Sequence, residues 1–85
     1  MSTAVSECIR SLIVEHLDMS VPTGFDETTP LYDGGLGMDS FTTVELITLI
    51  ENHFQVEFKL DEITPEHFVN VRTVATLVER YLASR

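Results

Sequence analysis

The sequence predicts a small all-α domain, a four-helix bundle with a long ordered loop between its first two helices and a short third helix. Three segments carry apolar residues at helical spacing, the pattern of helices that each bury one face. A run rich in glycine and proline, residues 19–39, separates the first two of these segments. Polar and apolar residues alternate over residues 55–59, as they do in a β-strand, but the sequence offers no second strand for pairing. With 85 residues, the chain is expected to form a single domain, residues 1–85, around one modest core.

The first helix is predicted over residues 3–18, and Ser2 or Thr3 could cap its start. Its apolar stripe consists of Val5, Cys8, Ile9, Leu12, Ile13 and Leu17. Because Cys8 lies on this stripe, we expect it to be a small buried hydrophobe. A catalytic Cys8 would need an activating base, and His16 lies two turns further along. A single cysteine excludes an internal disulfide and suits a reducing compartment.

The long connection, residues 19–39, is expected to be an ordered loop. It contains apolar residues that can pin it across the helices, namely Phe25, Leu31, Tyr32 and Leu36. Its acidic residues lack the alternating spacing of a calcium loop, so no metal site is expected. No Gly-Lys-Ser/Thr follows its glycines, which excludes a phosphate-binding P-loop and favours tight backbone turns.

The second helix is predicted over residues 40–54, with Ser40 as its first residue. Its inward stripe consists of Leu46, Ile47, Ile50 and Phe54, with Leu49 at the border. A different face carries Phe41, Val44 and Thr48 beside Glu45 and Glu51. This exposed apolar strip either docks on a partner protein or only widens the core face, and the spacing alone favours neither.

The C-terminal part predicts a short third helix and a longer last helix. Thr64-Pro65 marks the start of the short helix, with threonine as cap and proline at the first helical position. Thr73 is expected to cap the last helix. The buried stripe of the last helix consists of Val74, Leu77, Val78, Tyr81 and Leu82.

The net charge of −9 is unevenly distributed along the chain. Residues 1–58 contain ten acidic residues and one basic residue, Arg10, whereas residues 59–85 contain four of each. Nucleic acid and anionic membrane surfaces are therefore poor partners, and proteins with basic patches are good ones. The alternative is that the acidity only keeps a small protein soluble. The start resembles no signal peptide, and no apolar run reaches the ~20 residues that span a bilayer, so a cytoplasmic protein is expected.

The residues around the start of the second helix resemble the attachment segment of acyl carrier proteins. The matching residues are Leu36-Gly37-Met38-Asp39-Ser40-Phe41, then Thr43-Val44-Glu45-Leu46, then Glu51 and Phe54. This family carries 4′-phosphopantetheine on the serine of an Asp-Ser-Leu motif. The resemblance therefore implies that Ser40 is the attachment residue and that Asp39 helps to present it. Phe41 stands where the family usually has leucine or isoleucine.

The resemblance implies a discrete, non-catalytic, monomeric carrier with an acyl-carrier-like four-helix fold. A phosphopantetheinyl transferase would modify Ser40, and an acyl- or aminoacyl-loading enzyme would charge the arm. A ketosynthase or other condensing enzyme and further pathway enzymes would use the thioester. The resemblance also implies that these enzymes dock on the face formed by Phe41, Val44, Glu45, Thr48 and Glu51.

Two features favour a polyketide or nonribosomal peptide pathway over fatty acid synthesis. Asn52 and His53 follow Glu51, whereas carriers of fatty acid synthesis often have further acidic residues at these positions. The run from Asp61 to Val74 also looks like the third-helix region of carriers in secondary metabolism. A carrier of fatty acid synthesis is the alternative.

Two readings from other classes compete with the carrier. An acidic helical interaction protein without a covalent arm would share the charge, the size and the exposed apolar strip. A small serine-dependent enzyme would need a histidine within hydrogen-bond reach of Ser40. His16, His53 and His67 are scattered along the chain, and the Gly-x-Ser-x-Gly motif of hydrolases is absent.

Overall fold

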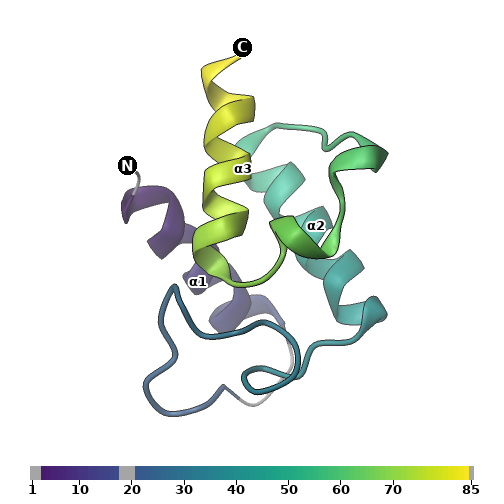
Figure 1. Ribbon diagram of the computed structural model, residues 1–85. Helices are drawn as coiled ribbons and strands as arrows, with labels where there is room; N and C mark the ends of the chain where they lie inside the picture. The colour runs from purple at the N-terminus through teal and green to yellow at the C-terminus, as the bar shows by residue number, and fades with distance from the viewer. Residues whose placement is uncertain (1–2, 18–20, 85) are drawn as a thin grey trace.

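Three α-helices pack around one core in the computed structural model, which describes residues 3–17 and 21–84 (Figure 1). They are α1 (Thr3–His16), α2 (Ser40–Phe54) and α3 (Val71–Ala83). No strand occurs in the described residues, so the all-α class is confirmed. α1 packs against both α2 and α3, and its buried side chains lie between them.

The predicted short third helix is not an α-helix but two single 3₁₀ turns, η1 (Leu60–Glu62) and η2 (Pro65–His67). The first turn closes with a hydrogen bond from the Ile63 N–H to the Leu60 carbonyl, 3.2 Å long. Pro65 has no N–H to donate to Asp61, so a helix that starts at Leu60 cannot continue through it. The predicted four-helix bundle is therefore not confirmed.

The end of α1 differs from the prediction, whereas α2 agrees with it. α1 ends at His16, and Leu17 already lies outside the helix; Asp18 lies outside the described residues. Ser2 and the side chain of Thr3, the two expected caps of α1, also lie outside them. α2 has its predicted bounds and ends at Gln55, which adopts the left-handed conformation with φ 58°.

The cap of α3 is Asn70 and not Thr73, so the prediction for Thr73 is wrong. The Asn70 side chain accepts the Thr73 N–H at 2.9 Å, and the Thr73 hydroxyl accepts the Asn70 N–H at 3.2 Å. This reciprocal pair is a capping box, with Thr73 three residues inside the helix.

The core draws fully buried side chains from all three helices. Ile9 and Ile13 of α1, Leu46 and Ile50 of α2, and Val71, Val74 and Val78 of α3 expose no surface. Cys8 is only partly buried, contrary to the prediction. Its Sγ atom lies 3.0 Å from Nε2 of His53, because α1 brings the end of α2 against it.

The described part of the long connection, residues 21–39, contains no helix or strand and is fixed to the rest of the domain. Phe25, Leu31 and Leu36 are buried, and Tyr32 packs against the core, as expected of apolar anchors. The Leu31 N–H donates to the Val69 carbonyl at 2.9 Å, so this loop is joined to the segment before α3. Residues 18–20 lie outside the described part of the loop.

Gly35 marks a close approach within this loop. A Cβ atom at this position would lie 1.9 Å from the Pro30 carbonyl oxygen, so only glycine fits without a backbone shift. The turn that delivers the chain to α2 depends on this contact.

None of the described helices is long and apolar enough to cross a membrane.

Candidate functional site

Ser40 is the first residue of α2, and its side chain is exposed. Gly37, with φ 67°, turns the chain toward the helix, and the buried Met38 anchors it. Within the described residues, the Ser40 hydroxyl makes no hydrogen bond to protein. The first N–H groups of a helix lack intrahelical acceptors, and the helix dipole adds positive potential there. This position therefore favours an anion attached to Ser40.

Asp39 caps α2. Its carboxylate accepts the Thr42 N–H and the Thr42 hydroxyl, both at 2.8 Å. The backbone N–H of Thr42, and after it the Thr42 hydroxyl, holds the pKa of the Asp39 carboxyl below its usual value. Asp39 is therefore an ionised cap that fixes the backbone immediately before Ser40.

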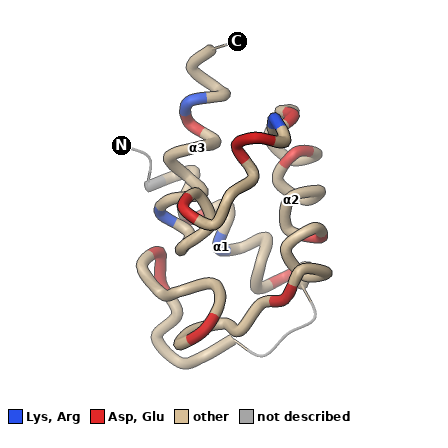
Figure 2. Tube along the Cα trace, turned by 45° about the vertical axis from the view of Figure 1, so that its right-hand side comes forward, with Lys and Arg blue, Asp and Glu red and all other residues tan. Residues whose placement is uncertain are grey.

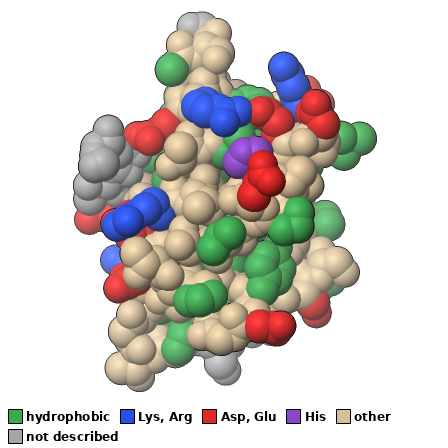
Figure 3. All heavy atoms as spheres, in the orientation of Figure 1, with side chains coloured by type: hydrophobic (Ala, Val, Ile, Leu, Met, Phe, Trp, Pro, Cys, Tyr) green, Lys and Arg blue, Asp and Glu red, His purple; other side chains and the backbone are tan. Residues whose placement is uncertain are grey.

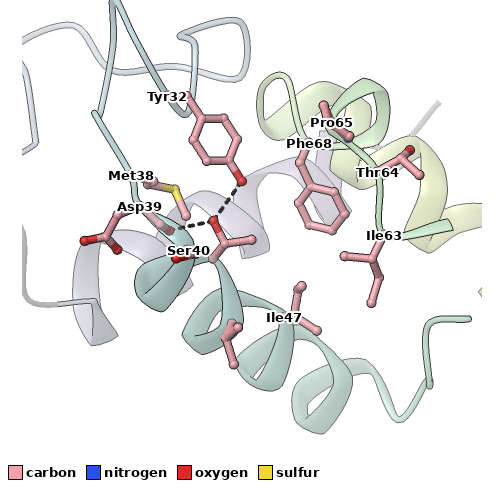
Figure 4. Close-up of a pocket in the computed structure, with 11 residues that line it drawn as sticks. Tyr32, Met38, Asp39, Ser40, Ile47, Ile63, Thr64, Pro65 and Phe68 are labelled. Carbon is pink, nitrogen blue, oxygen red and sulfur yellow. Dashed lines mark hydrogen bonds between the residues drawn. The ribbon is translucent and has the colours of Figure 1, made fainter. Parts of the chain in front are cut away.

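A second hydrogen-bond chain fixes the same turn from the other side (Figure 4). The Thr43 hydroxyl donates to the Asp39 carbonyl at 2.8 Å, and the Tyr32 hydroxyl lies 2.8 Å from the Thr43 hydroxyl. The Thr43 hydroxyl has a single proton, which it donates to the Asp39 carbonyl. The Tyr32 hydroxyl must therefore be the donor in its hydrogen bond with the Thr43 hydroxyl. Tyr32 thus ties the incoming loop to the first turn of α2.

An apolar groove of about 530 Å³ opens beside Ser40, between α2 and the segment that precedes α3. Figure 4 shows Ile47, Ile63 and Phe68 around it, with Ser40 at one end. Its lining consists of Tyr32, Met38, Asp39, Ser40, Thr43, Val44, Ile47, Ile63, Thr64, Pro65 and Phe68. Hydrophobic side chains gather on this face of the molecule in Figure 3. The groove has the volume and chemistry of a site for an apolar ligand.

No histidine is placed as a base for Ser40. His53 contacts Cys8, and Nδ1 of His67 lies 2.8 Å from the Glu62 carbonyl oxygen. His16 is exposed at the end of α1 and has no hydrogen bond within the described chain. The described residues also contain no group of three or more His, Cys, Asp or Glu side chains that could hold a metal ion. The arrangement does not build a nucleophilic serine.

The face of α2 expected to meet partners is partly apolar and open. Phe41 is 71% exposed and Val44 is 60% exposed, beside the exposed Glu45 and Thr48. Glu51 is only partly buried, and its carboxylate accepts the Phe58 N–H at 2.9 Å, so it also holds the segment that follows α2. Figure 2 shows acidic residues along α2, which contains no Lys or Arg.

The sequence pointed to Ser40 and Asp39 at the start of α2. It did not indicate the groove that extends from these residues toward Phe68. Tyr32 was expected only as a loop anchor and Thr64 only as a helix cap, and Ile63 and Phe68 were not singled out. The hydroxyls of Tyr32 and Thr43 meet across 11 positions of sequence, and no spacing rule connects a loop to a helix in this way. The Cys8–His53 contact was also missed, because it joins two helices across 45 positions of sequence.

Comparison with known proteins places this geometry in context. The family described as "Phosphopantetheine attachment site" matches residues 8–81. Acyl carrier protein 3 of Ralstonia nicotianae is 38% identical over 81 residues, which cover 95% of this chain and 88% of that protein. A chain in a structure described as the crystal structure of an FAD-dependent dehydrogenase aligns with a TM-score of 0.64 and 32% identity. That alignment covers 87% of this chain and 97% of the other.

Proposed function

The chain belongs to the phosphopantetheine-attachment family, whose covalent cofactor is 4′-phosphopantetheine, and from this we propose that Ser40 is the residue that carries it. One observation carries the proposal: Ser40 presents an exposed, unbonded hydroxyl at the first position of a capped helix. A phosphodiester formed there gains roughly 0.3–1 kcal/mol from the helix dipole. Asp39 and Tyr32 hold the backbone on either side of the attachment point.

The groove beside Ser40 is a second feature that fits 4′-phosphopantetheine, because it begins at the proposed attachment residue. When bound, the cofactor supplies a thiol that holds an acyl or aminoacyl group as a thioester. The chain itself does no chemistry on that group. It raises the local concentration of the tethered group at each partner enzyme, and the groove offers an apolar surface to an acyl chain.

We propose that partner enzymes dock on the exposed face of α2 beside Ser40. Phe41 and Val44 supply exposed apolar surface, and Glu45 and Glu51 supply negative charge. This combination fits a partner with a basic rim around an apolar patch. The partners of this class are a phosphopantetheinyl transferase, a loading enzyme and a condensing enzyme such as a ketosynthase.

The pathway is proposed to be polyketide or nonribosomal peptide synthesis, with fatty acid synthesis as the alternative. Asn52 and His53 at the end of α2 reduce the acidic character of the docking face. The two 3₁₀ turns between α2 and α3 are proposed to take the place of the short third helix of carriers.

One comparison favours a redox enzyme among the partners. The alignment spans nearly all of both chains, so the chain in the dehydrogenase structure is about as long as this one. A chain of this length forms one small domain and cannot also hold FAD and a dehydrogenase active site. We therefore propose that a flavin-dependent dehydrogenase is one candidate partner that acts on the carried group.

The test is the intact mass of the protein after incubation with coenzyme A, magnesium and a broad-specificity phosphopantetheinyl transferase. The wild type is expected to gain one phosphopantetheine, and Ser40→Ala is expected to gain none. Ser11→Ala is the matched control, because it removes an exposed serine hydroxyl on α1 and leaves Ser40 in place.

Failure of the folded wild type to gain the group would favour the armless interaction protein. An adduct on Ser40→Ala would move the attachment to another hydroxyl, of which Thr42 and Thr43 are the nearest in sequence. The modified protein from this experiment is then the substrate on which loading enzymes are compared one by one.

A further inference from the structure

One wall of the groove is built from a segment that is only weakly anchored in the core. Residues 59–67, here called the wall segment, contain both 3₁₀ turns, and none of their side chains is buried. Ile63, Thr64 and Pro65 of this segment nevertheless line the groove opposite α2. Of these side chains, Ile63 is the one that packs against the core, so polar contacts must share in holding the wall in place.

Those contacts converge on Glu62 and α3. The Glu62 carboxylate accepts a hydrogen bond from the Tyr81 hydroxyl at one oxygen and from the Arg80 guanidinium at the other. The Tyr81 hydroxyl in turn accepts the Lys59 N–H at 2.9 Å. Tyr81 therefore binds the wall segment at two points, and we call Glu62, Arg80 and Tyr81 the latch.

The latch is connected to both turns of the wall segment. Nδ1 of His67 lies 2.8 Å from the Glu62 carbonyl oxygen and 3.1 Å from the Thr64 hydroxyl. This contact joins η1 to η2 across the residues that face the groove. A movement of Glu62 is thus transmitted to Thr64, which lies on the groove wall.

An aromatic row connects the latch to the groove floor. The Tyr81 ring packs edge-on against Phe58, with centroids 5.3 Å apart, and Phe58 packs edge-on against Phe68 at 6.2 Å. Phe68 is 2% exposed and lines the groove. The row fixes the Tyr81 ring, so the position of the hydroxyl is set by the core and not by solvent.

We propose that the latch sets the opening of the groove and thereby determines how well an apolar group tethered at Ser40 is shielded from solvent. Glu62 and Tyr81 are positioning residues in this scheme, because they act through Ile63 and Thr64. The inference rests on the proposed function, since it needs a group attached at Ser40. The hydrogen bond from Tyr81 lowers the pKa of the Glu62 carboxyl, so the latch has its charged acceptor at neutral pH.

The test compares cleavage of two thioesters by hydroxylamine, a small nucleophile in solution. Wild type and Tyr81→Phe are loaded at Ser40 with octanoyl or acetyl phosphopantetheine, using a transferase and the corresponding coenzyme A thioester. Tyr81→Phe keeps the ring contact with Phe58 and loses only the hydroxyl. Its octanoyl thioester is expected to be cleaved roughly three- to tenfold faster than that of the wild type, the shift expected when a partly exposed hydrogen bond to a charged group is lost.

The acetyl thioester separates shielding from general destabilisation, because a two-carbon group has little apolar surface to bury in the groove. Its cleavage rate is expected to be the same in all variants. Glu27→Gln is the matched control, since it breaks the other carboxylate–arginine pair on α3, Glu27 with Arg72 at 3.0 Å, away from the groove. Glu62→Gln is the second latch variant. Thermal melting of each variant establishes that the protein is folded at the assay temperature.

The outcomes separate the inference from the function on which it rests. If no group attaches to wild-type Ser40, the proposed function is wrong. If the group attaches and the octanoyl thioester is cleaved equally fast in wild type, Tyr81→Phe and Glu62→Gln, the latch is wrong and the carrier stands. Acceleration of octanoyl and acetyl cleavage by the same factor, or equal acceleration in Glu27→Gln, also overturns the latch.

Discussion

Asp39 shows how much one side chain contributes to the site. Its carboxylate receives both hydrogen bonds that Thr42 can donate, and its carbonyl receives the Thr43 hydroxyl. These three contacts set the backbone direction at Ser40 before any partner arrives. Presentation of the serine is thus a local property of the helix start.

The pH dependence of this cap provides a residue-scale prediction. Hydrogen bonds from Thr42 lower the folded-state pKa of Asp39, so the ionised form is favoured in the folded protein. The resulting stability is fully present above the unfolded pKa, near 4, and is lost as the pH falls through the lower folded-state pKa. The difference in denaturation midpoint between wild type and Asp39→Asn is therefore expected to shrink as the pH falls below ~4.

The measurement is a urea denaturation series of both proteins from neutral to acidic pH. Other carboxyl groups titrate in both proteins, so their effects cancel in the difference. A difference that stays constant down to pH values below the folded-state pKa would show that the Asp39 charge does not support the cap.

Residue identity singled out Ser40 and Asp39, which the structure places at the start of α2, but not every neighbour. Ser40 and Asp39 follow from a motif in which sequence neighbours are also spatial neighbours. Cys8 was expected to be buried because its stripe is apolar, yet its burial depends on what α2 places against it. Thr73 was expected to be the cap, although Asn70 three residues earlier also has a capping side chain and the backbone turns at Asn70.

At the scale of elements, the start of α3 is the joint that holds the domain together. The loop contacts it through Leu31, whose N–H bonds to the Val69 carbonyl, and through Glu27, whose carbonyl accepts the Arg72 N–H at 3.0 Å. Asn70, which forms the capping box with Thr73, lies between Val69 and Arg72. A change at Asn70 therefore affects the helix and the anchorage of the loop.

Asn70→Ala is expected to destabilise the domain by about 0.5–2 kcal/mol, the usual effect of losing a helix cap. Thermal unfolding is the measurement, and each kcal/mol corresponds to a decrease of roughly 4–8 °C in a domain of this size. Asn70→Ser retains an acceptor for the Thr73 N–H and is expected to recover most of the loss. Equal loss in both variants would contradict the cap.

The sequence predicted where helical segments occur better than it predicted which kind of helix each segment forms. The spacing of apolar residues predicted α1, α2 and α3, and α2 with its full bounds, because a stripe of one face spans the whole helix. The region before α3 is too short for such a stripe. Thr64-Pro65 correctly marked a start there, but Pro65 also interrupts the hydrogen bonds of any longer helix, and the result is two 3₁₀ turns.

For the whole molecule, the distribution of charge is the feature that a partner meets first. The excess of negative charge lies in residues 1–58, which contain the loop, Ser40 and α2. Opposite fields accelerate encounter over distances of about a Debye length, which is ~10 Å at 0.1 M salt and ~3 Å at 1 M. Modification of Ser40 should therefore depend on ionic strength.

We expect kcat/KM of phosphopantetheinyl transfer to fall as salt rises, mainly through an increase in KM. Glu45→Lys, on the exposed face of α2, is expected to raise KM severalfold at low salt and to flatten the salt dependence. Glu15→Lys is the matched control, because it makes the same change of net charge on α1. Equal effects of both variants would mean that only net charge matters and that α2 is not the docking face.

The groove is a property of the whole molecule and could not be predicted from the sequence. Its walls come from the loop at Tyr32, the first turns of α2 and the wall segment, which meet only after the helices pack. Periodicity identifies which side chains point inward on one element, but it does not say where two elements leave a space. The latch between Glu62 and Tyr81 spans 19 positions of sequence and is invisible for the same reason.

The partial burial of Cys8 has a practical consequence for spectroscopy. Cys8 is the only cysteine in the chain, and partial burial raises the pKa of its thiol, so little of the reactive thiolate forms at neutral pH. The flexible arm would add a second, freely exposed thiol. A maleimide dye applied briefly at neutral pH is then expected to label the arm faster than Cys8. A second dye, applied for longer at higher pH, would label Cys8 and complete a distance pair within one unmutated protein.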